Sequence, residues 1–151
     1  MEETKPHIAL GADHGGFKFK EAIKEMLTVE GYPIFDFGTF SGESIDYPDI
    51  VHPVATAIEK GEATLGILIC GSGQGVSITA NKHQGVRAAL AWNEDIAKLA
   101  RQHNNANVLC LGERFMELED VKKIIIAFLN SKFEGGRHER RVSKIAIQEE
   151  E

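Results

Sequence analysis

Residues 65–75 read LGILICGSGQG, and this stretch decides the fold class. Leu65–Cys70 is almost entirely apolar, as is typical of a parallel strand that helices cover on both faces. Gly71–Gly75 forms a glycine-rich turn after it, and a helix is expected through Val76–Lys82. A buried strand, a tight turn and a helix in this order predict one unit of an α/β domain.

The same alternation of strand and helix runs through the chain. Further strands are predicted at residues 7–12, 34–37, 86–92 and 107–111, and further helices near residues 19–30, 48–60, 94–103 and 121–129. Short connections between such units predict parallel strands with right-handed crossovers. We therefore expect an α/β fold: one three-layer, Rossmann-like domain over residues 1–151, with a five-stranded parallel sheet and a C-terminal helical extension.

The composition excludes several classes of protein. The chain has 151 residues and a formal net charge of −6, which argues against a protein that coats nucleic acid or anionic membranes. No apolar run approaches the roughly 20 residues that cross a bilayer, and Met1–Pro6 lacks the apolar core of a signal peptide. Two cysteines, Cys70 and Cys110, make no disulfide framework. We expect a cytoplasmic protein.

Polar residues follow three of the predicted strands at their carboxyl ends, where open α/β sheets bind ligands. Asp13 and His14 follow the first strand, Cys70 ends the third and is followed by Gly71–Gly75, and Arg114 follows the fifth. Glycines let backbone N–H groups point at an anion, and the following helix adds its positive end. Alternatively, Asp13 caps a helix, His14 is an exposed loop residue, and Cys70 is a buried structural thiol. We interpret Cys110, inside an apolar run, as such a structural thiol.

The glycine turn differs from the common nucleotide-binding motifs. Its spacing is G-x-G-x-G rather than G-x-G-x-x-G, and the next predicted strand ends in Leu90-Ala91-Trp92 without an acidic residue. The chain contains no Gly-Lys pair for a P-loop, and a hydrolase elbow would need glycine at Cys70. The remaining interpretation is an oxyanion cradle beside a thiol.

Two more clusters stand apart from the strand ends. His103 and Asn104 lie at the end of a predicted helix, and Arg137 and Arg141 would lie one turn apart on a C-terminal helix. Paired guanidinium groups can share one phosphate through bidentate hydrogen bonds. The alternatives are a surface histidine, a helix cap and a solvated basic turn. The histidines form no H-E-x-x-H motif and no zinc-type pair with cysteine, so no metal site is predicted.

Taken together, these motifs resemble the type B ribose-5-phosphate isomerases. The matching segments keep their order over about residues 8–145, and they are Asp13–Gly16, Cys70–Gly75, Ala80–Lys82, Arg101–Asn104, Asn107–Val108, and Glu134–His138 with Arg141. The family also includes allose-6-phosphate and galactose-6-phosphate isomerases, so the resemblance leaves the sugar open.

The resemblance implies an aldose–ketose isomerase of the pentose phosphate pathway that needs no cofactor and no metal ion. It makes Cys70 the base that moves a proton between C1 and C2 through an enediolate, and His103 a residue that helps to open the sugar ring. The implied substrate-binding residues are Asp13, His14, Gly71, Ser72, Gly73, Gln74, Gly75, Asn104, Arg114, Arg137 and Arg141, the last two on the phosphate. The resemblance also implies a homodimer or a dimer of dimers whose site is shared between subunits. Outside this family, the alternative is a non-catalytic module that binds phosphate or a nucleotide.

Overall fold

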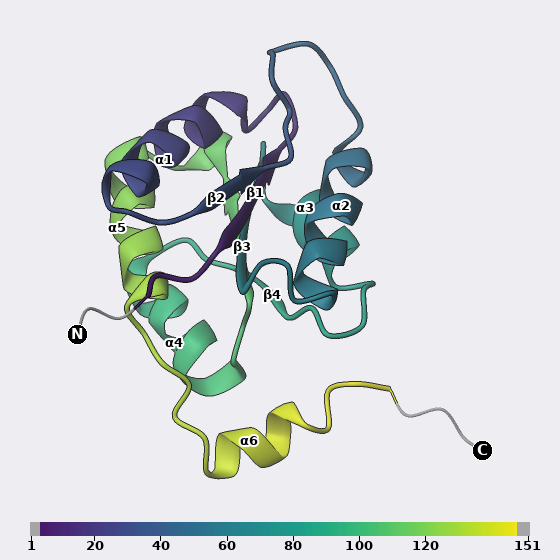
Figure 1. Ribbon diagram of the computed structural model, residues 1–151, viewed down its shortest axis with the longest axis vertical. Helices are drawn as coiled ribbons and strands as arrows, with labels where there is room; N and C mark the ends of the chain where they lie inside the picture. Colours follow the sequence, from purple (N-terminus) through teal and green to yellow (C-terminus); the bar gives the residue numbers. More distant parts are fainter. Residues whose placement is uncertain (1–3, 148–151) are drawn as a thin grey trace.

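A five-stranded sheet forms the centre of the computed structural model, which describes residues 4–147 (Figure 1). The strands are β1 (Ile8–Ala12), β2 (Ile34–Asp36), β3 (Leu65–Cys70), β4 (Ala88–Leu90) and β5 (Val108–Gly112). They are arranged in the order β2-β1-β3-β5-β4, and every neighbouring pair is parallel. The predicted α/β fold with a five-stranded parallel sheet is confirmed.

Helices cover both faces of the sheet and so make three layers. One face carries α1 (Phe17–Val29), α4 (Glu94–Asn104) and α5 (Leu118–Leu129), and the other carries α2 (Tyr47–Glu59) and α3 (Gln74–Ala80) (Figure 1). The last helix, α6 (Arg137–Val142), lies beyond the end of α4, away from the sheet, as the predicted C-terminal helical extension. Within residues 4–147, no helix combines the length and apolarity that a membrane span requires.

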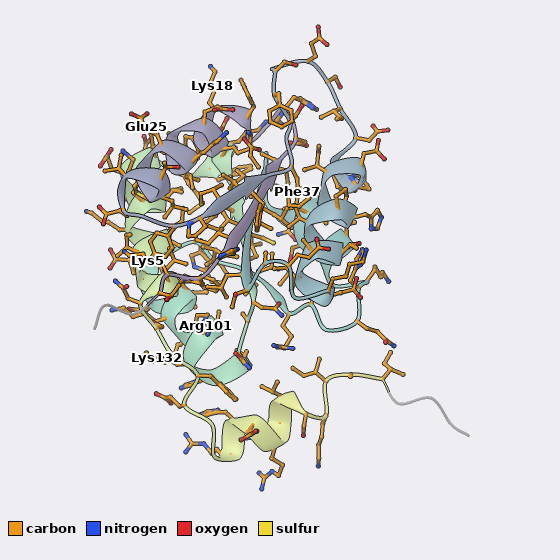
Figure 2. The ribbon with its side chains drawn as sticks, in the orientation of Figure 1. Lys5, Lys18, Glu25, Phe37, Arg101 and Lys132 are labelled. Atoms are coloured by element: carbon orange, nitrogen blue, oxygen red, sulfur yellow. The ribbon has the colours of Figure 1, made fainter. Side chains whose placement is uncertain are left out.

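Alternating residues of the strands build two apolar cores. Ile67 and Ile69 of β3 pack under α1, α4 and α5, whereas Leu68 and Cys70 face α2 and α3. Figure 2 shows side chains filling both spaces, and the partly buried Phe37, directly after the edge strand β2, packs against the core on the α2–α3 face. Because every residue of β3 is buried, its near-continuous apolar sequence is the signal of a central strand.

The fourth strand is shorter than predicted, because residues 86–92 were expected and only Ala88–Leu90 pair with β5. At its start, the backbone N–H of Arg87 donates to the side-chain oxygen of Asn107 (2.8 Å), and the Asn107 side chain donates to the carbonyl of Gly85 (2.8 Å). A side chain thus satisfies backbone groups that a longer strand would have paired.

The order of the strands places a crevice between β1 and β3. From β1 the chain passes through α1 to β2 on one side, whereas β3 lies on the other side and leads into α3 on the opposite face. This is the topological switch point, where open α/β sheets bind ligands beyond the carboxyl ends of the strands. The segments that follow β1 and β3 therefore lie next to each other.

Candidate active site

A cavity of about 360 Å³ opens at this switch point. It is lined by Asp13, His14, Gly15, Tyr47, Cys70, Gly71, Ser72, Gly75, Arg114 and Phe115. The segments after β1, β3 and β5 thus converge as their positions at the strand ends predicted. A larger hollow of about 820 Å³ between α4 and α5 is lined mainly by charged and polar surface side chains and contains none of the predicted site residues.

The segment after β1 holds Asp13 and His14 in fixed orientations. Asp13 is buried, and its Oδ1 accepts a hydrogen bond from the N–H of Gly15 (2.9 Å), so it closes the turn before α1 rather than capping the helix at Gly16. The Nδ1 of His14 accepts a hydrogen bond from the N–H of Ile45 (3.2 Å). The neutral imidazole therefore carries its proton on Nε2, which makes Nε2 a donor for a ligand oxygen.

A buried ion pair fixes the loop that holds His14. Lys20 of α1 is fully buried, and its Nζ lies 2.9 and 2.7 Å from the two carboxylate oxygens of Asp36 at the end of β2. Asp36 also accepts a hydrogen bond from the N–H of Gly38 (2.9 Å), which begins the loop towards Ile45. Burial acts to raise the pKa of Asp36, but the hydrogen bonds from Lys20, Gly38 and Lys24 outweigh it and hold the pKa below its usual value.

Cys70 lies at the floor of the cavity, at the end of β3. Its Sγ accepts a hydrogen bond from the N–H of Gly73 (3.2 Å), in the turn that leads into α3. The next N–H, that of Gln74, donates to the Ser72 hydroxyl (3.2 Å). One N–H of the turn therefore points at the Cys70 thiol itself, while other residues of the turn line the cavity.

The glycines of the turn are required by close packing. Gly73 has a φ of +78°, and a Cβ there would lie 2.5 Å from the Leu90 side chain and 3.1 Å from the backbone of Leu111. A Cβ on Gly112 would lie 2.6 Å from the Ser72 carbonyl, and one on Gly75 would lie 2.7 Å from the ring of Tyr47. The backbone of the turn thus lies directly against the backbone at the end of β5, with no side chain between them.

Arg114 forms the third wall of the cavity. It belongs to a short 3-10 turn (Glu113–Phe115) that follows β5, and its N–H donates to the Gly71 carbonyl (3.0 Å). Its side chain lies over Gly71, where an added Cβ would be 3.1 Å from Nε. The guanidinium group is therefore placed directly beside the glycine turn, where it can contact an anionic ligand.

The other predicted residues gather in a second place, at the end of α4. The ring of His103 stacks on that of His138 in α6, with centroids 4.1 Å apart and planes 9° from parallel. The N–H of Glu134 donates to the carbonyl of Gln102 (3.0 Å), which ties the C-terminal segment to α4. Arg137 and Arg141 are exposed on α6, one helical turn apart as predicted, and Asn104 ends α4.

The two groups lie at opposite ends of the sheet. Cys70 pairs in register with Gly112 at the carboxyl end of β5, whereas α4 with His103 leads into the amino end of β5 at Val108. Four residue steps separate Val108 from Gly112, about 13 Å at roughly 3.3 Å per residue. Figure 1 shows the same separation, with α6 beyond the end of α4, and Figure 2 places Arg101 of α4 in that part of the molecule. One chain therefore does not bring Cys70 and His103 together.

Sequence reasoning gave no role to three residues in these places. Tyr47 lines the cavity from the start of α2, although the sequence suggested only a helix beginning near Pro48. Glu134 and His138 surround His103, and their spacing in sequence matches no metal or catalytic motif. Burial, together with the neighbouring His103 and Arg137, lowers the pKa of His138, so its stacked ring is favoured in the neutral form.

Comparisons with known proteins agree on one family. A family model described as ribose/galactose isomerase matches residues 8–145. The ribose-5-phosphate isomerase B of Escherichia coli is 46% identical over 143 residues, which cover 95% of this chain and 96% of that protein. A crystal structure of a ribose 5-phosphate isomerase from Thermotoga maritima is 48% identical, with a TM-score of 0.91 over 93% of this chain and 97% of that one. The structure of ribose-5-phosphate isomerase B from Mycoplasma genitalium with bound ribulose-5-phosphate is 46% identical, with a TM-score of 0.89 over 92% and 93% of the two chains.

Proposed function

The chain belongs to the ribose/galactose isomerase family, and from this premise we propose that it interconverts D-ribose 5-phosphate and D-ribulose 5-phosphate. The observation that carries the proposal is the convergence of Cys70, the glycine turn, Asp13, His14 and Arg114 on one cavity. The similar protein from Mycoplasma genitalium was solved with bound ribulose-5-phosphate, the product of this reaction. Such a site suits a small sugar phosphate as its ligand.

In the proposed reaction, Cys70 is the base. It removes the proton from C2 of the open-chain aldose, an enediolate forms, and the proton returns to C1 while the hydroxyl proton moves from O2 to O1. The substrate is oxidised at C2 and reduced at C1, so the reaction needs no external oxidant or reductant. A positioned base contributes roughly 10²–10⁴-fold to such a step. N–H groups of the Gly71–Gly75 turn other than those of Gly73 and Gln74, which already have partners, would stabilise the enediolate oxygen.

The substrate's other contacts need residues from both groups. Asp13 and His14 would hold sugar hydroxyl groups, and Arg114 the developing charge or the phosphate. His103 and Asn104 would help to open the furanose ring, while Arg137 and Arg141 bind the phosphate. Binding a remote phosphate keeps the scarce open-chain sugar in register with the base, so that its binding energy serves the chemistry.

A second copy of the chain would complete the site. Because His103 and the two arginines lie at the opposite end of the sheet from Cys70, one copy would offer its α4–α6 end to the cavity of the other. A two-fold contact of this kind makes two equivalent sites. The surface beside the cavity suits such a contact. Phe115, which lines the cavity, is 78% exposed, and Trp92, which lines a neighbouring hollow with Phe115, is 64% exposed. Exposed aromatic side chains of this size are typical of surfaces that a partner covers.

The experiment is a turnover assay on a panel of sugar phosphates. Ribose 5-phosphate, allose 6-phosphate and galactose 6-phosphate are offered to the wild-type protein, to Cys70→Ala and to Cys110→Ala. Cys110 is the matched control: it is fully buried on the neighbouring strand, and burial raises the pKa of its thiol, so that it stays protonated.

We expect turnover of ribose 5-phosphate that Cys70→Ala lowers by at least about 100-fold and that Cys110→Ala retains. Turnover of a hexose phosphate alone would support the proposed isomerisation but show that ribose 5-phosphate is not the substrate. If Cys70→Ala kept kcat within a few-fold of the wild type, Cys70 would not be the base. Stabilisation by a nucleotide with no turnover of any sugar would instead indicate a binding module.

A further inference from the structure

Three side chains of the α4–α6 end form a cluster with the composition of a metal site. His103, Glu134 and His138 each offer one donor atom, and all three atoms lie within 4.8 Å of one another. The Oε1 of Glu134 is 3.5 Å from the Nε2 of His103 and 3.7 Å from the Nε2 of His138. Two imidazoles and one carboxylate are a common protein ligand set for zinc.

Two of the three ligand separations are close to those around a tetrahedral ion. Zinc bonds nitrogen and oxygen ligands at about 2.0–2.1 Å, so neighbouring ligands of a tetrahedral ion lie roughly 3.3 Å apart. The distances from Glu134 to the two nitrogens exceed this by only a few tenths of an ångström. The rings are nearly parallel, so one must tilt for both lone pairs to meet at an ion. His103 has the room, because 38% of its side chain is exposed.

The backbone already holds these ligands together. The N–H of Glu134 is bound to the carbonyl of Gln102, the residue before His103, and His138 is buried at the start of α6. Binding would therefore require rotation of side chains but no rearrangement of the chain. With only three protein ligands, and with Arg137 and Arg141 nearby, the site would bind an ion more weakly than a closed four-ligand site does.

We propose that His103, Glu134 and His138 form an inhibitory site for a divalent transition-metal ion of the zinc class. Imidazole ligands favour zinc, cobalt or copper over magnesium and calcium, which prefer oxygen. A bound ion occupies the Nε2 of His103 and so removes that ring from catalysis. The inhibition rests on the function proposed above, whereas the binding of the ion does not.

Binding is tested first, without any assay of activity. The full-length chain is freed of metal with a chelator and titrated with Co²⁺, whose visible absorption reports tetrahedral coordination. We expect one Co²⁺ per chain, displaced by Zn²⁺, and binding weakened at least tenfold in both Glu134→Gln and His138→Ala. Circular dichroism checks that both variants remain folded.

The matched control is a second histidine pair elsewhere in the chain. The Nδ1 of His52 lies 2.6 Å from the Nε2 of His83, whose Nδ1 lies 2.6 Å from Glu59, so these groups bond to one another in a line. Binding should be unchanged in His52→Ala. Absence of a tetrahedral spectrum in the wild type, or a spectrum unaffected by Glu134→Gln and His138→Ala, would overturn the site.

Inhibition is tested second, on the isomerase reaction. We expect Zn²⁺ to inhibit the wild type, EDTA to restore its rate, and the Zn²⁺ concentration for half-inhibition to rise at least tenfold in Glu134→Gln. If Zn²⁺ inhibited Glu134→Gln and the wild type equally, the ion would be acting at another place in the chain, and the inhibitory role of this site would be wrong. If Co²⁺ bound as expected but the wild type turned over no sugar phosphate, the proposed function would fail while the metal site stood.

Discussion

Mixing two inactive variants tests whether the site is shared between copies of the chain. One variant is Cys70→Ala, which removes the proposed base at the carboxyl end of the sheet. The other is the double variant Arg137→Ala/Arg141→Ala, which removes two exposed charges from α6. Each charge-assisted hydrogen bond contributes about 1.5–3 kcal/mol, so the loss of two arginine contacts should lower kcat/KM by roughly 10²–10⁴-fold. Each variant alone should be nearly inactive.

The mixture should regain activity because Cys70 and the two arginines of α6 lie at opposite ends of the sheet, so that each site would draw on two copies of the chain. In an equal mixture of freely exchanging copies, half of the dimers contain one copy of each variant. In such a dimer, the intact cavity of the arginine variant meets the intact α6 of the Cys70→Ala copy, and the other site carries both defects. About a quarter of all sites are then wild type, so the mixture should regain about a quarter of the wild-type rate. A dimer of dimers built on the same pairwise contact gives the same fraction.

The assay is the initial rate of ketose phosphate formation before and after exchange. Different affinity tags on the two variants allow mixed dimers to be isolated in two successive steps, and these should show about half of the wild-type rate. Retention of both tags also proves that subunits have exchanged. If isolated mixed dimers were no more active than the average of the two variants, each site would lie within one chain, and the shared site would be refuted.

Further predictions concern stability. Asp36→Asn leaves the buried Lys20 with only the half-exposed carboxylate of Glu21, 3.1 Å away, as a charged partner, and urea unfolding should show a loss of about 3 kcal/mol. Lys24→Ala, at the half-exposed end of the same cluster, should cost less than about 1 kcal/mol. Because the pKa of Asp36 is lower in the folded chain, its stabilising effect is present at neutral pH and is lost as the pH falls below about 4. Between pH 7 and pH 3, the free energy of unfolding should therefore depend less on pH in Asp36→Asn than in the wild type. Parallel curves for the two proteins would contradict the role of this ion pair. Gly16→Ala places a Cβ 2.5 Å from the Ile69 carbonyl and should lower stability by about 1–3 kcal/mol, whereas Gly42→Ala, with nothing within 4 Å, should be close to neutral in the same thermal melts.

Much of the fold is readable in the sequence, because the relevant signals are local. The continuous apolar run of β3 indicates a strand that is buried on both faces, and the helical spacing of apolar residues in α5 indicates a helix that is buried on one face. Both elements form as expected. The cap of α4 is equally local, because the Asn93 side chain accepts a hydrogen bond from the N–H of Ile96, three residues on. Strand β4 is the exception, because its start depends on a contact between Arg87 and Asn107, twenty residues further along the chain.

The candidate site was only partly readable for a related reason. Residues after parallel strands converge by topology, so the cavity around Cys70 could be predicted from strand order alone. The same topology places the end of a connecting helix at the opposite end of the sheet, which separates His103 from Cys70. The contact of His103 with Glu134 and His138 depends on how the C-terminal segment folds back onto α4, and no spacing in the sequence encodes that path.

The backbone contact between the glycine turn and β5 has a consequence for how this scaffold can diversify. At Gly73 and Gly112 the two segments touch without side chains, and any larger residue there collides with the neighbouring segment. Point substitution therefore has almost no means of reshaping the end of the site where the proton would move. Under the proposed function, changes in sugar length would be accommodated at its rim, where Tyr47 and Phe115 carry replaceable side chains. Under the proposed function, this architecture would keep the proton transfer constant and leave the choice of sugar open to selection.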